Sequence, residues 1–402
     1  MKNKFTKQLL IFTLIIVLSN AATYVLTVNG FLNFSSTQFI GVSSRLNTAQ
    51  VKKLFEAENL INDKFYQKPD ENKLLEGAVK GMFTALEDEY SDYYTPEEFA
   101  KLMEESTGEY EGIGVVVYAN EDKDTVVLQV YEKTPAAEAG MRMNDKIVKV
   151  DGEDVLGKGT DYTVSKMRGE SGTEVEVTFE HDNGEQVTKK LKRAKINQDS
   201  VSAEMLDSSI GYIQINEFTT QTGNQFDEKL TQLEKQNING LIVDLRYNGG
   251  GIVDDAVHVA NRLLGDGEVG YHVDQNGNRI DYDRGDGDRF NKPVVFLVNE
   301  GTASASEILA GAVQDDGLAK LVGTKTFGKG VVQELSTFSD GSGYKITTET
   351  NFTPKGHAIH KVGLTPDVNL ELSEKPENFF TMTHEADNQL QKAIEIIRNE
   401  KK

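Results

Sequence analysis

The sequence predicts a multidomain α/β protein, because three apolar runs of strand length alternate with intervals long enough for helices. These runs are 211–215, 241–245 and 294–298. The chain has 402 residues, more than one ordinary domain needs, and 38% of them are hydrophobic, which is normal for globular material. We therefore expect two or three domains, each with its own core.

The first 40 residues carry the pattern of an export signal. Lys2, Lys4 and Lys7 precede an apolar run over 9–18 that continues less purely to residue 28. About 20 such residues span a bilayer, and the basic flank stays in the cytoplasm. Because residues 19–21 also read as a cleavage site, a cleaved signal peptide is the alternative to the membrane anchor that we favour. Both interpretations place the bulk of the chain outside the cytoplasm, either anchored to the cell membrane or secreted.

Two flanking regions have the apolar spacing of amphipathic helices. One is the N-terminal region 45–105, and the other is the C-terminal tail 376–402, where Leu390, Ile394 and Ile397 recur at helical spacing. Amphipathic helices at the ends of a chain are usually packing or association elements.

Composition argues against several classes of function. A formal net charge of −21 argues against nucleic-acid binding, which needs basic surface. The absence of cysteine excludes disulfides, a thiolate nucleophile and zinc sites of the cysteine type. His357 and His360 are spaced i, i+3, but no HExxH motif or carboxylate cluster accompanies them. We expect no metal and no cofactor, and we interpret the carboxylates over 281–288 as solvated.

A glycine-rich turn followed by an apolar strand begins a smaller module. The turn offers backbone N–H groups that can hold a terminal carboxylate, and the strand edge can pair with an extended peptide. Segments 134–141 and 144–152 follow as a helix and a hairpin, so that 106–193 resembles a PDZ domain. The predicted peptide-binding residues are Gly112, Ile113, Gly114 and Val115.

Ser304 and Lys329 are the candidate catalytic residues of the larger region, 194–375. Ser304 lies between an apolar run and a helix-like stretch, so a strand-to-helix turn would present its hydroxyl at a helix N-terminus. Lys329 can act as a base only when neutral, which requires its pKa to fall by roughly 3 units from about 10.4. Gln333 carries an amide that can accept from that amine without adding charge.

Each of these signals has a structural alternative. A small-residue run is often only a serine-capped helix start, and glycine-flanked lysines are usually solvated. A third motif over 244–251 favours the catalytic interpretation, because its three glycines let backbone N–H groups approach a ligand closely.

The three motifs DLRYNGGG, GTASASE and TFGKGVVQ, in this order, resemble the carboxyl-terminal processing peptidases, the tail-specific serine endopeptidases of bacteria and plastids. The resemblance covers roughly residues 45–375. It implies that Ser304 is the nucleophile, Lys329 the general base and Gln333 the residue that positions the lysine. It also implies an oxyanion hole made by the N–H groups of Ala305 and Gly250, and a core of stacked ββα units of the crotonase and Clp type.

Further roles follow from the same resemblance. Arg168 would link occupancy of the PDZ domain to the catalytic centre, although the helix dipole alone favours an arginine at a helix end. Glu307, Asp315 and Thr326 match family residues with supporting roles, for which plain structural hydrogen bonding is an equal alternative. The terminal regions of the family imply a homodimer.

These motifs predict a serine endopeptidase that recognises protein C-termini through its PDZ domain and cleaves near the tail by an acyl-enzyme mechanism. Extracytoplasmic processing or quality control would be its role. One alternative is a PDZ-bearing scaffold protein whose protease fold has lost activity, and another is an esterase. A Ser-His-Asp triad is disfavoured, because none of the six histidines lies in a motif that would aim it at Ser304.

Overall fold

A computed structural model describes residues 46–120, 122–131, 133–197, 199–206, 209–373 and 382–400. The chain divides into two compact units, residues 1–79 and 80–402. The predicted export segment 1–40 lies outside the described residues. Within the described ranges, no helix is both long and apolar enough to cross a membrane.

The described part of the first unit is helical, as the sequence predicts. Helix α3 (Thr48–Lys64) begins with a capping box, in which the Gln50 N–H donates to Asn47 Oδ1 and the Asn47 N–H donates to Gln50 Oε1. No residue of α3 is buried, and Leu54 and Leu60 are 56% and 60% exposed. Helix α4 (Glu71–Thr84) follows and crosses the boundary between the units.

The second unit begins with a short strand and a helix, β1 (Asp92–Tyr94) and α5 (Pro96–Thr107). Thr95 precedes α5, and its N–H donates to Glu98 Oε2 while its Oγ1 accepts from the Glu98 N–H, a second capping box. Strand β1 pairs antiparallel with β18 (Gly343–Phe352). The other strands of this sheet are β13 (Tyr271–Asp274), β14 (Arg279–Asp281) and β17 (Val331–Thr337).

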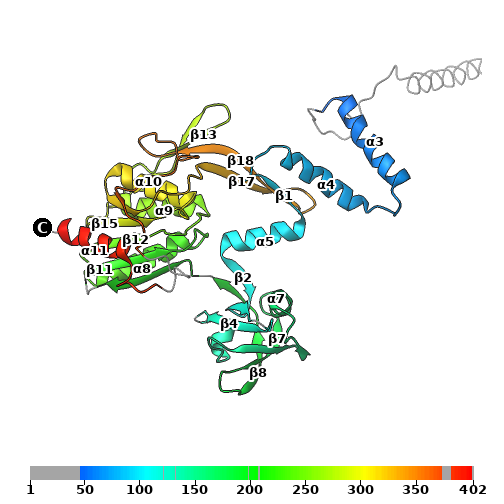
Figure 1. The fold of residues 1–402 in the computed structure, drawn as a ribbon, viewed down its shortest axis with the longest axis horizontal. Coiled ribbons are helices and arrows are strands. Elements are labelled where there is room, and N and C mark those ends of the chain that lie inside the picture. Colours follow the sequence, from blue (N-terminus) through cyan, green and yellow to red (C-terminus); the bar gives the residue numbers. More distant parts are fainter. Residues whose placement is uncertain are drawn as a thin grey trace, which may run out of the picture. The chain divides into compact units, whose positions relative to one another are not determined.

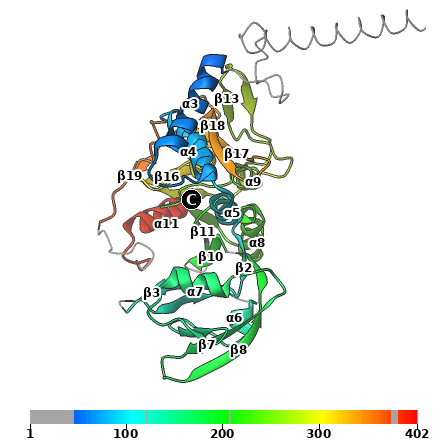
Figure 2. The same ribbon diagram turned by 90° about the vertical axis from the view of Figure 1, so that its right-hand side faces the viewer.

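The smaller module is a β-rich domain with its own core. Its sheet has the strand order β3-β4-β5-β7-β8, with β6 paired to β5. Val127, Ile147 and Phe179 are fully buried in the core of this module, whose strands and α7 can be followed in Figure 2. The elements are β3 (Val115–Ala119), β4 (Thr125–Val130), α6 (Pro135–Glu138), β5 (Lys146–Val150), β6 (Glu153–Asp154), α7 (Thr160–Met167), β7 (Glu174–Glu180) and β8 (Gln186–Lys192). Strands β2 (Glu109–Gly112) and β9 (Ala194–Asn197) pair where the chain enters and leaves the module.

The larger α/β core contains a six-stranded sheet in the order β10-β11-β12-β15-β16-β19 (Figure 1). All neighbours are parallel except β10 and β11. The three predicted strands are confirmed as β11 (Ile210–Ile215), β12 (Gly240–Asp244) and β15 (Val294–Val298). The remaining elements are β10 (Val201–Leu206), α8 (Thr222–Lys235), α9 (Val253–Leu264), α10 (Ala305–Asp316), β16 (Ala319–Gly323), β19 (Val368–Asn369) and α11 (Asn388–Glu400).

Alternate residues of these strands point to opposite faces of the sheet. Val243 and Phe296 belong to the apolar cluster that contains α8, α9 and α10. Their neighbours Ile242 and Val295 belong to a second cluster with α11. All four are completely buried, which explains why the strand sequences are apolar on both sides. The predicted C-terminal helix is therefore part of the core.

A buried ion-pair network connects α11 to the loop after β12. Arg246 is 3% exposed, and its Nη2 lies 2.5 Å from Asp244 Oδ2 and 2.7 Å from Asp387 Oδ2. Its Nη1 donates to Gln389 Oε1. Burial disfavours the charged guanidinium, but the two carboxylates outweigh this effect and raise the pKa of Arg246. Asp387 Oδ1 also accepts from the N–H of Leu390, so one carboxylate caps α11 and holds the arginine.

Candidate active site

Ser304 occupies a strained turn between β15 and α10. Its φ of 58° and ψ of −121° lie outside the regions that a residue with a side chain normally adopts. Asn248 holds this turn, since its carbonyl accepts from the Ala303 N–H at 3.0 Å and from Ser306 Oγ at 3.1 Å. The Asn248 side chain in turn donates to the carbonyl of Ile215. The predicted strand-to-helix turn at Ser304 is confirmed.

The glycine triplet lies directly against this turn. A Cβ atom on Gly250 would come within 2.8 Å of Ser304 Cβ and 3.0 Å of the Ala305 nitrogen, so only glycine fits. Ala305 is the first residue of α10, where N–H groups have no partner within the helix. The Gly250 N–H, however, donates to Asn248 Oδ1 at 2.9 Å. The proposed oxyanion donor is thus close to Ser304 but engaged in a hydrogen bond.

Ser304, Lys329 and Gln333 line one cavity of about 180 Å³. Leu102 and Ser106 of α5 contribute a further part of its wall. The other lining residues are Glu217, Gly251, Ile252, Val253, Val331, Val332, Leu335 and Lys345. The structure therefore brings together the three residues that the motifs predict as catalytic, and none of the six histidines lines this cavity.

The surroundings of Lys329 favour the neutral amine. Burial is the main cause that lowers the pKa of Lys329, and the positive charge of Lys345 acts in the same direction. Asp88 and Glu89 act in the opposite direction. Within the described part of the chain, no carboxylate forms an ion pair with Lys329. A lysine in such surroundings can serve as a base at lower pH than a solvated one.

Gln333 does not make the hydrogen bond that its predicted role requires. A register shift separates Val332 from Gln333 in the pairing of β17 with β18, and Gln333 Nε2 donates to the carbonyl of Val331 at 3.2 Å. No hydrogen bond joins Gln333 to Lys329 among the described residues. The irregularity of β17 lies directly before Gln333, and bulges of this kind change the direction of side chains.

Glu307 joins the nucleophile turn to the lysine loop. Its side chain is completely buried and accepts four hydrogen bonds. Oε2 accepts from the N–H groups of Ser304, at 3.0 Å, and Lys329, at 2.8 Å. Oε1 accepts from Thr326 Oγ1 at 2.5 Å and from the Gly328 N–H at 2.8 Å. Burial raises the pKa of Glu307, and these bonds oppose that rise.

The other two supporting residues have different positions. Thr326 Oγ1 donates to Glu307 and accepts from the Leu364 N–H at 2.7 Å, so it belongs to the same network. Asp315 lies near the far end of α10, where Oδ2 accepts from the Lys355 N–H at 2.9 Å. Asp315 anchors a loop and does not line the cavity of Ser304.

The smaller module has a separate groove of about 290 Å³. Its lining includes the four predicted peptide-binding residues, Gly112, Ile113, Gly114 and Val115, together with Val164, Met167 and Arg168. The carbonyls of Ile113 and Gly114 accept from the N–H groups of Ala136 and Tyr131. Within the described ranges, the N–H groups of Ile113 and Gly114 donate to no acceptor, so the turn into β3 offers two backbone donors to a ligand.

Arg168 contacts α5 and neither Lys329 nor Gln333. Its Nη1 lies 2.6 Å from Glu104 Oε2, and its guanidinium lies 5.3 Å from the centre of the Tyr110 ring. Leu102 and Ser106 of the same helix line the catalytic cavity, so α5 contacts both that cavity and a residue that lines the groove.

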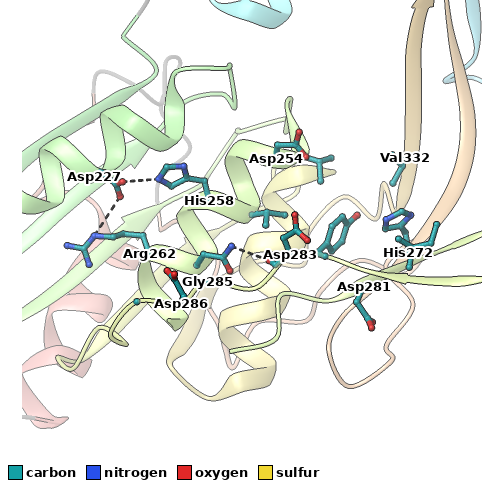
Figure 3. A pocket seen from close by; sticks show the side chains of 16 residues that line it. Asp227, Asp254, His258, Arg262, His272, Asp281, Asp283, Gly285, Asp286 and Val332 are labelled. Carbon is teal, nitrogen blue, oxygen red and sulfur yellow. Dashed lines mark hydrogen bonds and ion pairs between the residues drawn. The ribbon is translucent and has the colours of Figure 1, made fainter. Parts of the chain in front are cut away.

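A larger cleft of about 820 Å³ lies beside the catalytic cavity and shares Val253 and Val332 with it (Figure 3). None of the predicted catalytic residues lines this cleft. Figure 3 shows acidic side chains around it from α8, α9, β14 and the loop after β14, with His258 paired to Asp227 at 2.8 Å. The described residues include no group of histidines and carboxylates that could hold a metal ion.

Comparison with known proteins identifies the chain. Residues 209–370 match the model of peptidase family S41, 126–180 match a PDZ domain, and 17–98 match the N-terminal domain of the activating protease CtpB. The carboxy-terminal processing protease CtpA of Bacillus subtilis is 33% identical over 369 residues, which cover 92% of this chain and 78% of that protein. The chain belongs to the carboxyl-terminal processing proteases.

A second relative agrees with this assignment. The carboxyl-terminal-processing protease of Synechocystis is 34% identical over 363 residues, which cover 88% of this processing protease and 84% of the relative. A solved structure, the photosystem II D1 C-terminal processing protease, is 32% identical over 81% of this chain and 89% of that one, with a TM-score of 0.48. The predicted family, the PDZ domain and the serine-type peptidase activity are confirmed.

Some residues of this processing protease were not found from its sequence. Lys345 faces the candidate base from β18, and Leu102 and Ser106 enter the cavity from α5. None belongs to a motif, and each lies far from Ser304 along the chain, so local patterns carry no signal for them. For the part of the chain that contains α5, the sequence predicted only a helical region over 45–105.

Proposed function

We propose that this processing protease cleaves proteins near their C-termini by acyl transfer, with Ser304 as nucleophile and Lys329 as general base. The observation that carries the proposal is that Ser304 and a lysine with a lowered pKa line the same cavity. Neutral Lys329 takes the proton of Ser304 Oγ, and the oxygen attacks the peptide carbonyl. The resulting ammonium then protonates the departing amine, and a water molecule, deprotonated by Lys329, hydrolyses the acyl-serine.

The tetrahedral intermediate carries a negative oxygen that needs donors. Ala305 offers an N–H at the start of α10, and two such backbone donors contribute several kcal/mol to the transition state. Gly250 would supply the second donor by releasing its bond to Asn248 Oδ1 or by sharing it. We also propose that Gln333 orients Lys329 after its amide leaves the carbonyl of Val331.

We propose that the PDZ groove selects the substrate by its C-terminal carboxylate. The N–H groups of Ile113 and Gly114 are the donors, and Val164 and Met167 provide apolar contact for the last side chain. An unstructured peptide with a free C-terminus is therefore expected to be cleaved with a kcat/KM at least about tenfold higher than its C-terminal amide, since bonds to charged groups contribute about 1.5 to 3 kcal/mol. Fluorescence-quenched peptides that differ only at this end measure the ratio.

Ser304→Ala serves as the blank in this experiment and is expected to cleave neither peptide. Equal cleavage of acid and amide by the unaltered enzyme would contradict carboxylate capture and leave the serine mechanism standing. Turnover by Ser304→Ala would contradict the mechanism itself.

We propose that Arg168 passes occupancy of the groove to the catalytic cavity through Glu104 and α5. Arg168→Ala is expected to reduce, by about two- to fivefold, the stimulation of cleavage that a free tail peptide gives, because partly exposed ion pairs contribute about 0.2 to 1 kcal/mol. Lys166→Ala is the matched control, since Lys166 pairs with Glu153 within the PDZ domain. Stimulation that is the same in Arg168→Ala and Lys166→Ala would rule out this route.

We further propose that the enzyme acts outside the cytoplasm, held at the membrane by residues 1–40. The support is the basic flank and apolar run of that segment. A homodimer also remains a proposal, and the exposed Leu54 and Leu60 of α3 support association.

A further inference from the structure

Tyr90 lies against the amine of Lys329. The Nζ atom is 4.8 Å from the centre of the Tyr90 ring, within the range of a cation–π contact. Tyr90 belongs to the loop between α4 and β1 and to none of the three motifs. Its ring therefore covers the candidate base from a part of the chain that the motifs do not include.

The loop that carries Tyr90 is fixed to the same sheet as the lysine loop. Ser91 Oγ donates to Asp88 Oδ2 at 2.5 Å and accepts from the Thr347 N–H of β18 at 2.9 Å. The next residues form β1, which pairs with β18, and Tyr93 is 4% exposed. Since β17 follows Lys329 and also pairs with β18, one strand holds both the ring and the amine in place.

The ring has two effects on the amine. It excludes water, and burial is the main cause that lowers the pKa of Lys329. Its π face also stabilises the ammonium ion that forms when Ser304 loses its proton; this effect raises the pKa but is outweighed by burial, since the pKa of Lys329 is lowered overall. Burial raises the pKa of Tyr90 to about 12, with a smaller contribution from Glu89, so the phenol is neutral when the enzyme works.

We propose that Tyr90 is a positioning residue of the reaction, which keeps water away from the neutral amine of Lys329 and holds the ammonium after proton transfer. This inference rests on the proposed role of Lys329 as the base. The other charged groups around the amine are Lys345 of β18, Asp88 and Glu89 of the Tyr90 loop, and Glu217 in the cavity wall. Lys345 lowers the pKa of Lys329, and Asp88 and Glu89 raise it. The Tyr90 ring differs from these groups because it separates the amine from water without adding a charge.

The test is the pH dependence of kcat/KM for the full-length enzyme with a quenched peptide substrate. Tyr90→Ala admits water to the amine, so the acid limb of the pH profile is expected to move up by about one pH unit. Near neutral pH, kcat/KM would then fall by about tenfold, and at high pH it would return to the value of the unaltered enzyme. Tyr90→Phe keeps the ring and is expected to leave the limb in place. The position of the limb does not depend on the fraction of enzyme that is folded. If Tyr90→Ala does not fold, Tyr90→Gln gives the same readout.

An acid limb that stays in place in Tyr90→Ala overturns the inference, and so does a limb that moves equally in Tyr90→Phe. The proposed function is tested separately, because it fails if a variant without the Lys329 amine, or Ser304→Ala, remains active. A Tyr90→Ala profile equal to that of the unaltered enzyme, together with an inactive Lys329 variant, removes the role of Tyr90 and leaves the catalytic lysine intact.

Discussion

Lys329→Met is expected to lower kcat/KM by at least about three orders of magnitude, because the substitution removes the general base and keeps the length of the side chain. A peptide cleavage assay checks this value, with the enzyme concentration determined by a method that does not depend on the active site. Lys325→Met is the matched control: Lys325 is exposed in the same loop, and its loss is expected to change kcat/KM by less than about twofold. A Lys329→Met enzyme within tenfold of the original would exclude this lysine as the base.

The same substitution has an expected effect on stability. The pKa of Lys329 is lowered in the folded state, so the unfolded chain binds this proton more readily. Ionisation of Lys329 therefore lowers the free energy of unfolding at neutral pH. This effect disappears as the pH rises from the pKa in the folded state towards the ordinary pKa of lysine. Lys329→Met is expected to unfold at the same Tm or a higher one in neutral buffer. A lower Tm would mean that the charged amine stabilises the fold.

Glu307→Gln is expected to lower both stability and activity, although the two side chains have the same shape. Each carboxylate oxygen accepts from two donors, and an amide nitrogen at either position would face at least one backbone N–H. A buried donor without an acceptor, and the loss of bonds to a charged group, cost about 2 to 4 kcal/mol. Because Ser304 and Lys329 both depend on Glu307, we also expect kcat/KM to fall by at least about 100-fold.

Thermal unfolding and peptide cleavage of Glu307→Gln measure the two effects. Asp315→Asn is the matched control, since it makes the same chemical change on the same helix, where the carboxylate accepts from Lys355 and not from the catalytic turn. We expect Asp315→Asn to keep kcat/KM within about threefold of the original. Equal losses of activity in the two variants would show that Glu307 has only a general structural role.

Much of the site could be predicted because its signals are local. The turn at Ser304 follows from an apolar strand, a small-residue run and a helix that are adjacent in sequence. The glycine triplet predicts a close approach of backbone to the site, and a Cβ on Gly250 would indeed have no space beside Ser304. The groove of the PDZ domain is predicted for the same reason, since its turn and strand are contiguous.

The remaining features depend on contacts that local patterns do not encode. Arg168 pairs with a glutamate 64 positions earlier, and Arg246 pairs with Asp387 141 positions later. Gln333 donates to the carbonyl of Val331 beside an irregularity in the strand register, which residue identity alone does not reveal. The sequence placed Glu307 near the nucleophile and left open whether it acts structurally, and the network now shows which groups it holds.

The bond between Arg246 and Asp387 couples two parts of the fold that lie far apart in sequence. The loop that follows Arg246 approaches the reactive serine, and Asp387, directly before α11, is the second carboxylate that pairs with the arginine. Loss of the Asp387 carboxylate would leave a buried guanidinium with one fewer partner, at a cost of several kcal/mol. The segment before α11 therefore supports the glycine loop beside the serine, although it supplies no group to the reaction.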